Sequence, residues 1–155
     1  MAKEIVNGIL ITSLIFFVSV FVPIVGFFSA LLIPLPVLIY RIKLGRKNGM
    51  LVPAISAGIQ LIVIGAFSAD ALFFIELLLT GFILGELIES KISIEKTILY
   101  TTGAVICSGL IGLLIYSTMS GAGIYAIVSG YVTKNLELTM VLYQNLGMSD
   151  ENIGL

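Results

Sequence analysis

Long apolar stretches separated by short polar segments run through most of the sequence. The first of them, residues 5–40, carries no charged side chain. About 20 mostly apolar residues cross the roughly 30 Å of hydrocarbon in a bilayer, so this stretch is long enough for two short spans. Pro23 and Gly26 lie near its middle and indicate a turn. The pattern predicts membrane spans over residues 5–22 and 24–40.

The second of these spans is interrupted by proline. Pro34 and Pro36 each lack a backbone donor and clash with the preceding turn, so they break or kink a helix. A re-entrant half-helix is the alternative to a full crossing, because irregular backbone at membrane depth is tolerated where protein or water covers it. The polar segment from Arg41 to Gly49 is then expected to be a short loop with four positive charges.

Three further apolar stretches follow, and each is bounded by polar or turn-forming residues. We predict spans over residues 50–69, 71–88 and 97–119. A tight turn over 68–70 separates the first two, and a polar connector over 89–96 separates the last two. The predicted fold is therefore all-α, a polytopic helical membrane bundle with about five transmembrane helices.

Residues 124–146 show a different pattern, in which apolar side chains recur at helical spacing with polar side chains between them. This pattern predicts an amphipathic helix, which either lies in the membrane interface or covers other helices. Gly147 is a helix stop signal, and residues 149–151 (Ser-Asp-Glu) resemble a new helix start. We therefore expect a bundle over 1–119 and an amphipathic helix with a tail over 120–155, continuing in a longer natural chain.

The composition excludes several classes of protein. Hydrophobic residues make up 59% and charged residues 11% of the chain, and the mean hydropathy is +1.17. A soluble domain of this size leaves too much of its area facing solvent to hide so much apolar surface, so we expect a membrane protein. The net charge of −1 does not favour a nucleic-acid partner, whose phosphates require an excess of basic residues. Because there is no histidine and only one cysteine, Cys107, we expect no His-based metal site, no catalytic triad, no internal disulfide and no cofactor.

Lysine and arginine are distributed unevenly between the predicted connections. With five spans and a cytoplasmic N-terminus, only Lys134 lies on the outer side. The basic residues on the inner side are Lys3, Arg41, Lys43, Arg46, Lys47, Lys91 and Lys96. By the positive-inside rule we expect a multi-pass membrane protein with a cytoplasmic N-terminus. The four basic residues from Arg41 to Lys47 also suit contact with anionic lipid.

Small residues recur at helical spacing in the predicted spans, where they allow two helices to approach closely. The candidate packing positions are Gly58 and Gly65 in the third span, Gly81 and Gly85 in the fourth, and Ser108 and Gly112 in the fifth. Glycine is frequent in membrane helices in general, so one position alone carries little weight. Together these positions indicate a compact bundle.

Ionisable and amide side chains within spans are costly in lipid and are therefore candidates for function. Glu76, in the fourth span, is the strongest candidate for binding a ligand, a cation or a proton. Gln60, in the third span, is the second candidate. For both, a structural hydrogen bond between helices is the competing interpretation. Glu86 lies near the inner end, where it can reach the connector, and Asp70 lies where it can cap the fourth span.

Several short segments have the residues and spacing of a known family. They are Pro23-Ile-Val-Gly26, Leu32-Ile-Pro34-Leu-Pro36 before Tyr40-Arg41, Gly45-Arg-Lys-Asn-Gly49, Glu86-Leu-Ile-Glu89 and Asn135-Leu-Glu137. In these segments the chain resembles the YybS-like family of bacterial multispan membrane proteins, also catalogued as domain of unknown function 2232. That family is distantly like the substrate-binding membrane subunits of energy-coupling-factor vitamin transporters. The resemblance implies a bundle of about six helices that captures a small molecule, with an ATPase module on another chain.

One segment departs from the pattern of those transporter subunits. They often dock their transmembrane partner through Ala-x-x-x-Ala in the first helix. The corresponding helix here has Gly8-Ile-Leu-Ile-Thr12. This departure argues against coupling to a transporter module through the first helix.

Two functions fit these observations. In the first, the protein is a transport-related subunit that binds a small solute in a midplane cavity reached by Glu76 or Gln60. In the second, it is a membrane scaffold or regulatory protein that contacts another membrane protein, or a second copy of itself, through the basic loop or the amphipathic helix. An enzyme is not expected, because no nucleophile–base pair can be assembled from these residues.

Overall fold

The chain folds into helices throughout the part that the computed structural model describes, residues 2–65 and 68–145. In chain order the helices are α1 (Ala2–Phe21), α2 (Pro23–Ala30), α3 (Pro34–Gly49), α4 (Leu51–Ile64), α5 (Ala69–Glu89), α6 (Ile94–Ser120) and α7 (Ile124–Asn145). The expectation of an all-α membrane bundle is therefore confirmed. The predicted helix start at 149–151 lies outside the described residues. The chain divides into two compact units, residues 1–112 and residues 113–155, which are described separately.

Proline and glycine set the path between α1 and α3. Val22 leaves the helical conformation (φ −117°, ψ 95°), and Pro23 occupies the first turn of α2, where its missing N–H is not needed. α2 is eight residues long and turns back onto α1, with Gly26 close to the backbone of Ser19. A turn over 31–33 separates α2 from Pro34 at the start of α3. The break predicted within the second span thus lies at residues 31–33, directly before Pro34.

α3 extends beyond the predicted end of the second span at residue 40. The helix continues through Arg41 to Gly49, so the segment expected to be a basic loop is mostly helical. Nothing in this segment stops a helix before Gly45, which has a positive φ (73°, with ψ 173°) and kinks the last turn. The helical stretch here that is long and apolar enough to cross a membrane is Phe28–Gly49, 22 residues.

α4 is shorter than the span predicted over residues 50–69. Its 14 residues rise about 21 Å, less than the hydrocarbon thickness. Gly65 ends the helix in the left-handed conformation (φ 81°), and its N–H bonds to the carbonyl of Leu61. Four helical stretches in the described residues, rather than five, are long and apolar enough to cross: Ala2–Phe21, Phe28–Gly49, Ala69–Glu89 and Ile94–Ser120.

The start of α5 is capped by serine. Ser68 Oγ accepts a hydrogen bond of 3.2 Å from the backbone N–H of Ala71. Asp70, expected as the cap, lies instead in the first turn of the helix, where a negative charge suits the helix dipole. The serine is the cap because its position is the last extended one before the helix.

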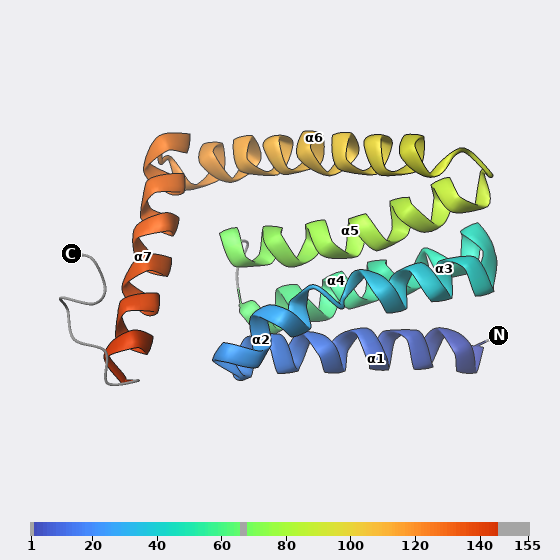
Figure 1. The fold of residues 1–155 in the computed structure, drawn as a ribbon, viewed down its shortest axis with the longest axis horizontal. Helices are drawn as coiled ribbons and strands as arrows, with labels where there is room; N and C mark the ends of the chain where they lie inside the picture. The colour runs from blue at the N-terminus through green and yellow to red at the C-terminus, as the bar shows by residue number, and fades with distance from the viewer. Residues whose placement is uncertain (1, 66–67, 146–155) are drawn as a thin grey trace. The chain divides into compact units, whose positions relative to one another are not determined.

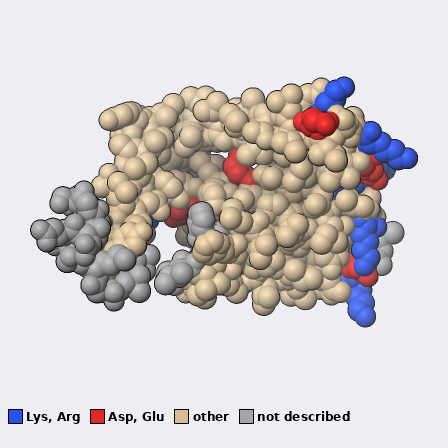
Figure 2. Space-filling model, viewed as in Figure 1, with Lys and Arg blue, Asp and Glu red and all other residues tan. Residues whose placement is uncertain are grey.

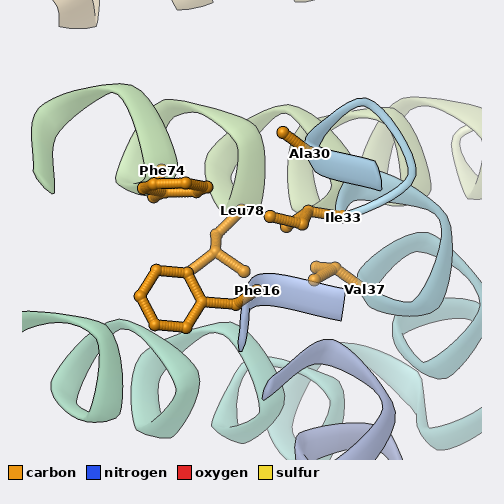
Figure 3. Packing of buried hydrophobic residues seen from close by; sticks show 6 residues of the cluster. All are labelled: Phe16, Ala30, Ile33, Val37, Phe74 and Leu78. Atoms are coloured by element: carbon orange, nitrogen blue, oxygen red, sulfur yellow. The ribbon is translucent and has the colours of Figure 1, made fainter. Parts of the chain in front are cut away.

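Within the first unit the helices run back and forth along one axis. α1, α4 and the beginning of α6 run in one direction, and α3 and α5 run in the other (Figure 1). α3 packs against α5, and α1 packs against α2, α3 and α4. Figure 3 shows the apolar core between them, which consists of Phe16, Ala30, Ile33, Val37, Phe74 and Leu78. The rings of Phe16 and Phe74 meet edge to face at 4.9 Å.

The outer surface of these helices is apolar. Leu14, Phe21 and Ile62 are among many large hydrophobic side chains that are mostly exposed, with Ile62 at 81%. Exposed apolar area on this scale is not stable against water, so these faces contact the lipid of a bilayer. Lysine and arginine gather at one end of the unit, where α1 begins and α3 and α5 end (Figure 2). We call this end the cationic end.

The second unit consists of the end of α6 and the helix α7. Gly121 has a positive φ (68°) between them. The predicted helix over 124–146 corresponds to α7, and its described side chains are exposed or half-buried. A shallow hollow on this helix is lined by Tyr131, Val132, Asn135, Leu136 and Thr139. Its lining comes from a single helix, so the placement of α7 in the interface or over other helices stays a prediction.

Candidate functional site

The buried face of α4 combines apolar and polar residues. Val52, Ser56 and Gln60 are spaced four apart, so they share one face of the helix, and each is at most 1% exposed. Gly58, two residues after Ser56, lies about 200° away around the helix and is exposed. α4 therefore turns Ser56 and Gln60 into the bundle and Gly58 outward.

Gln60 has no hydrogen-bond partner for either end of its amide. Both Nε2 and Oε1 are buried without a partner among the described residues, as is Ser56 Oγ. Burying a polar group without a hydrogen bond costs about 1–3 kcal/mol in proteins. Three side-chain polar atoms without a partner, from two residues one turn apart, therefore lie on this buried face of α4.

The depth of Gln60 follows from the packing of α4 on α1. A Cβ added at Gly8 of α1 would lie 3.0 Å from Val52, so these two residues are level with each other. Because α1 and α4 run in the same direction, Ser56 is level with Thr12 and Gln60 with Phe16 (Figure 1). Gln60 lies eight residues beyond Val52, about 12 Å along the axis from that level. The amide is therefore well inside the bundle.

Glu76 lies on the side of α5 that faces α6. Its Oε2 accepts a hydrogen bond of 2.8 Å from Ser108 Oγ on α6. Phe74, two residues earlier and about 200° away around the helix, faces Phe16 in the core. Glu76 is half-buried and faces α6, whereas Gln60 lies within the bundle of α1, α3, α4 and α5. The structure does not bring the two candidate ligand residues into one site.

A charged cluster at the cationic end is the most buried ionic feature of the described residues. Arg41 is 1% exposed, and its Nε and Nη2 both donate to Glu86 Oε2, at 3.0 and 2.5 Å. Nη2 also lies 2.8 Å from Glu89 Oε2, and Arg46 Nε lies 3.2 Å from Glu86 Oε1. Arg41 Nη1 is buried without a partner among the described residues. The cluster joins α3 to α5 and balances two positive charges with two negative ones.

Glycines on two helices make room for Arg41. A Cβ added at Gly85 would lie 2.6 Å from Arg41 Cγ, and one added at Gly49 would lie 2.7 Å from Arg41 Cα. The guanidinium also lies over the ring of Phe82, 5.7 Å from its centroid. Lipid contact, expected for Arg41, is therefore replaced by a buried ion pair, because α3 stays helical and turns this side chain toward α5.

The other three basic residues expected to contact lipid lie at the same end and are more accessible. Lys43 Nζ forms an exposed ion pair of 2.7 Å with Glu4 of α1. Arg46 is 77% exposed although it reaches Glu86. Lys47 is exposed. These three side chains keep access to lipid headgroups.

The predicted packing residues have different positions in the structure. Gly81 lies against the carbonyl of Pro34 and against Val37, and Gly85 lies against Arg41, so both are at the α3–α5 seam. Ser108 and Gly112 face α5, where a Cβ at Gly112 would lie 3.0 Å from Leu72. A Cβ at Gly58 or at Gly65 would meet nothing within 4 Å. Gly58 thus makes no close contact with another described helix, and Gly65 serves as the helix end.

Sequence reasoning missed the Arg41 cluster, although a signal for it existed. Glu86 and Glu89 are one turn apart on α5, and Arg41 follows directly on an apolar run. Two carboxylates and a cation at matching ends of two adjacent spans indicate an ion pair once the spans are known to pack together. No group of three or more His, Cys, Asp or Glu side chains in the described residues is arranged to hold a metal ion.

Comparison with known proteins places the chain in a membrane family. A family model described as "Predicted membrane protein (DUF2232)" matches residues 10–153. No curated protein and no solved structure matches the chain. Because the match covers almost the whole sequence and agrees with the long apolar helices, the chain belongs to the DUF2232 family of predicted membrane proteins.

Proposed function

We propose that this protein is a subunit of the bacterial inner membrane that binds a small, uncharged polar solute inside the bundle of α1, α3, α4 and α5. The observation that carries the proposal is the Gln60 amide, buried with neither of its polar atoms in a hydrogen bond. A purely structural protein gains stability when such a group is replaced by an apolar one. Its presence is explained if a solute supplies the missing partners.

The chemistry of this face defines the class of solute. The Gln60 amide both donates and accepts, and Ser56 adds a hydroxyl. α4 carries no charged residue, so nothing on this face would neutralise a charged solute. The proposed solute is therefore a neutral molecule with donors and acceptors close together, such as a hydroxylated or amide-bearing heterocycle.

The cationic end indicates the orientation. Seven of the eight lysine and arginine residues lie in or beside the segments that meet there, and the positive-inside rule assigns such an end to the cytoplasm. We therefore propose that the N-terminus is cytoplasmic. A solute arriving from outside would reach Gln60 from the end opposite the Arg41 cluster.

Coupling to a transporter module requires a different docking surface from the one that the energy-coupling-factor resemblance implies. Gly8 and Thr12 are buried, with Gly8 directly against Tyr40 and Val52. These positions serve packing within the chain. In the proposal, any transport partner contacts another surface of the protein.

The second candidate function, a membrane scaffold, is favoured by the close α3–α5 seam at Gly81 and Gly85. A bundle held together in this way is rigid enough to present a fixed surface to a partner. The buried polar atoms of α4 have no role in that function, so the two functions make different predictions for Gln60.

The test compares three proteins purified in mild detergent from the same membranes: wild type, Gln60→Leu and the lipid-facing control Ile62→Leu. Small molecules released from each by denaturation are identified by mass spectrometry, and thermal unfolding is measured in parallel. Wild type and Ile62→Leu are expected to retain a polar compound that Gln60→Leu loses. Ligand-free Gln60→Leu is expected to unfold at a higher temperature than ligand-free wild type, because it no longer buries an unpaired amide.

The same experiment separates the two functions. If all three proteins release the same compounds, the solute-binding proposal is wrong. If in addition another membrane protein co-purifies with all three, the scaffold function is supported.

A further inference from the structure

Some of the charges at the cationic end cancel one another within the chain. Three basic side chains and three carboxylates form ion pairs there, with N···O distances of 3.2 Å or less. The pairs are Lys43–Glu4, Arg41–Glu86, Arg41–Glu89 and Arg46–Glu86. These residues therefore add no net charge to this end of the protein.

Four further lysines at the same end are left without a counter-charge. All four are exposed, and none of them forms an ion pair with any residue that the structure describes. Each of the four candidate spans contributes one of them (Figure 2). They are Lys3 at the start of α1, Lys47 near the end of α3, Lys91 after α5 and Lys96 in the first turn of α6. The remaining carboxylate among the described residues of this end is that of Glu95, so a net positive charge remains.

One of these lysines occupies a position that the backbone would leave to glycine. Lys91 has a positive φ (54°), and it directly follows Ser90, the C-cap of α5. Glycine is the usual residue in this left-handed position after a helix, because it has no Cβ to strain the backbone. The protein thus keeps a cation at a position where the local conformation favours an uncharged residue.

The unpaired lysines lie where the apolar surface of the bundle ends. Ile94, two residues before Lys96, is 76% exposed, and Met50, three residues after Lys47, is 54% exposed. Apolar side chains that contact lipid therefore continue up to the lysines, whose stems can follow the apolar surface while the ammonium groups reach out of it. This places the ammonium groups at the depth of the lipid headgroups rather than far out in water.

We infer that the cationic end is a binding surface for the phosphate groups of anionic lipids, and that the four unpaired lysines carry this binding. An unpaired cation near the membrane surface is attracted by anionic headgroups, whereas a cation already paired with a carboxylate gains little from them. Because the four lysines belong to four different spans, one layer of anionic headgroups joins the ends of all four helices. The inference is independent of the solute site at Gln60.

Native mass spectrometry in mild detergent tests the inference with equal amounts of phosphatidylglycerol and phosphatidylcholine. Wild type is expected to retain more phosphatidylglycerol. Replacing the four lysines by glutamine is expected to lower this preference, by up to about fivefold for each lysine removed. The first control is the double variant Glu4→Gln, Lys43→Gln, which removes an ion pair at the same end without changing the net charge. The second control is Lys134→Gln, which removes an exposed lysine of α7. Both controls are expected to keep the wild-type preference.

Two additional measurements make the result decisive. Thermal unfolding in phosphatidylcholine alone is expected to be the same for wild type and the fourfold variant, because exposed lysines are not needed for packing. Inorganic phosphate is expected not to displace the bound phosphatidylglycerol, since it lacks the acyl chains that lie along the apolar surface. The inference is wrong if the fourfold variant keeps the wild-type preference, if the Glu4–Lys43 double variant loses as much of it, or if free phosphate displaces the lipid.

Discussion

Arg41 directs two nitrogens at one oxygen of Glu86, with Nε at 3.0 Å and Nη2 at 2.5 Å from Oε2. The pair joins α3 to α5 at the cationic end, and the arginine is almost completely buried while Glu86 is 28% exposed. Charge-assisted hydrogen bonds of this kind are the strong ones in proteins. The contact therefore fixes the relative position of two helices that are far apart in sequence.

Arg41→Ala is expected to lower the free energy of unfolding by about 3 kcal/mol, because it leaves Glu86 without its partner and empties the space between Gly49 and Gly85. Arg41→Lys is expected to recover only part of this loss, since an ammonium lacks the fixed fork of donors. The measurement is unfolding in a denaturant titration in one detergent. Lys47→Ala, at an exposed position of the same helix, is the control. If Arg41→Ala is as stable as Lys47→Ala, the ion pair makes no measurable contribution to the free energy of unfolding.

Two glycines predicted to pack should respond oppositely to alanine. Gly81→Ala places a Cβ against the carbonyl of Pro34 and 2.9 Å from Val37 Cβ, so α3 and α5 must separate. We expect a loss of about 1–3 kcal/mol. Gly58→Ala meets no atom within 4 Å and is expected to gain about 0.5–1 kcal/mol from helix propensity. Thermal unfolding of both variants in the same detergent measures the difference. A change in stability of the same sign in both variants would contradict the placement of Gly81 at a helix contact and of Gly58 away from one.

The contrast between these glycines shows what sequence patterns can and cannot determine. Small size at helical spacing selects both Gly58 and Gly81, but only the position of the neighbouring helices decides which one is at a contact. The sequence pattern did not decide which face of α4 is buried. In the structure the buried face carries Ser56 and Gln60 rather than Gly58. The existence of the helices was predictable, because apolar length and proline position are local properties.

The Arg41 cluster was harder to predict because it depends on two non-local facts. The helix had to continue past residue 40, and α5 had to lie beside it in an antiparallel direction. A basic residue after an apolar run ordinarily ends a span, and that general tendency placed the end of the second span at residue 40, whereas α3 continues to Gly49. The length of α4 was easier to predict from the sequence, since Gly65 is an ordinary helix stop within the apolar run.

Gly45 is expected to tolerate no side chain. Its φ of 73° with ψ of 173° is a conformation that only glycine adopts readily. Gly45→Ala should cost about 1–3 kcal/mol or straighten α3, which would withdraw Gly49 from Arg41. Gly103→Ala in α6, where a Cβ meets nothing within 4 Å, is the matched control. Thermal unfolding checks the cost, and a Gly45→Ala protein as stable as Gly103→Ala would show that the kink is not required.

The shared cationic end makes a prediction about sidedness that does not depend on any ligand. In a Cys107→Ser background, single cysteines replace Lys47 at the end of α3, Lys91 after α5, and Asp70 at the start of α5. Because Lys47 and Lys91 belong to the same end of the first unit and Asp70 to the opposite end, the first two must react alike and the third differently. A membrane-impermeant maleimide is expected to label Lys47→Cys and Lys91→Cys in inverted vesicles only, as the positive-inside rule requires, and Asp70→Cys in intact spheroplasts. Labelling of Lys47→Cys and Lys91→Cys from opposite sides would contradict the helix arrangement, whereas labelling of both from outside would reverse only the orientation.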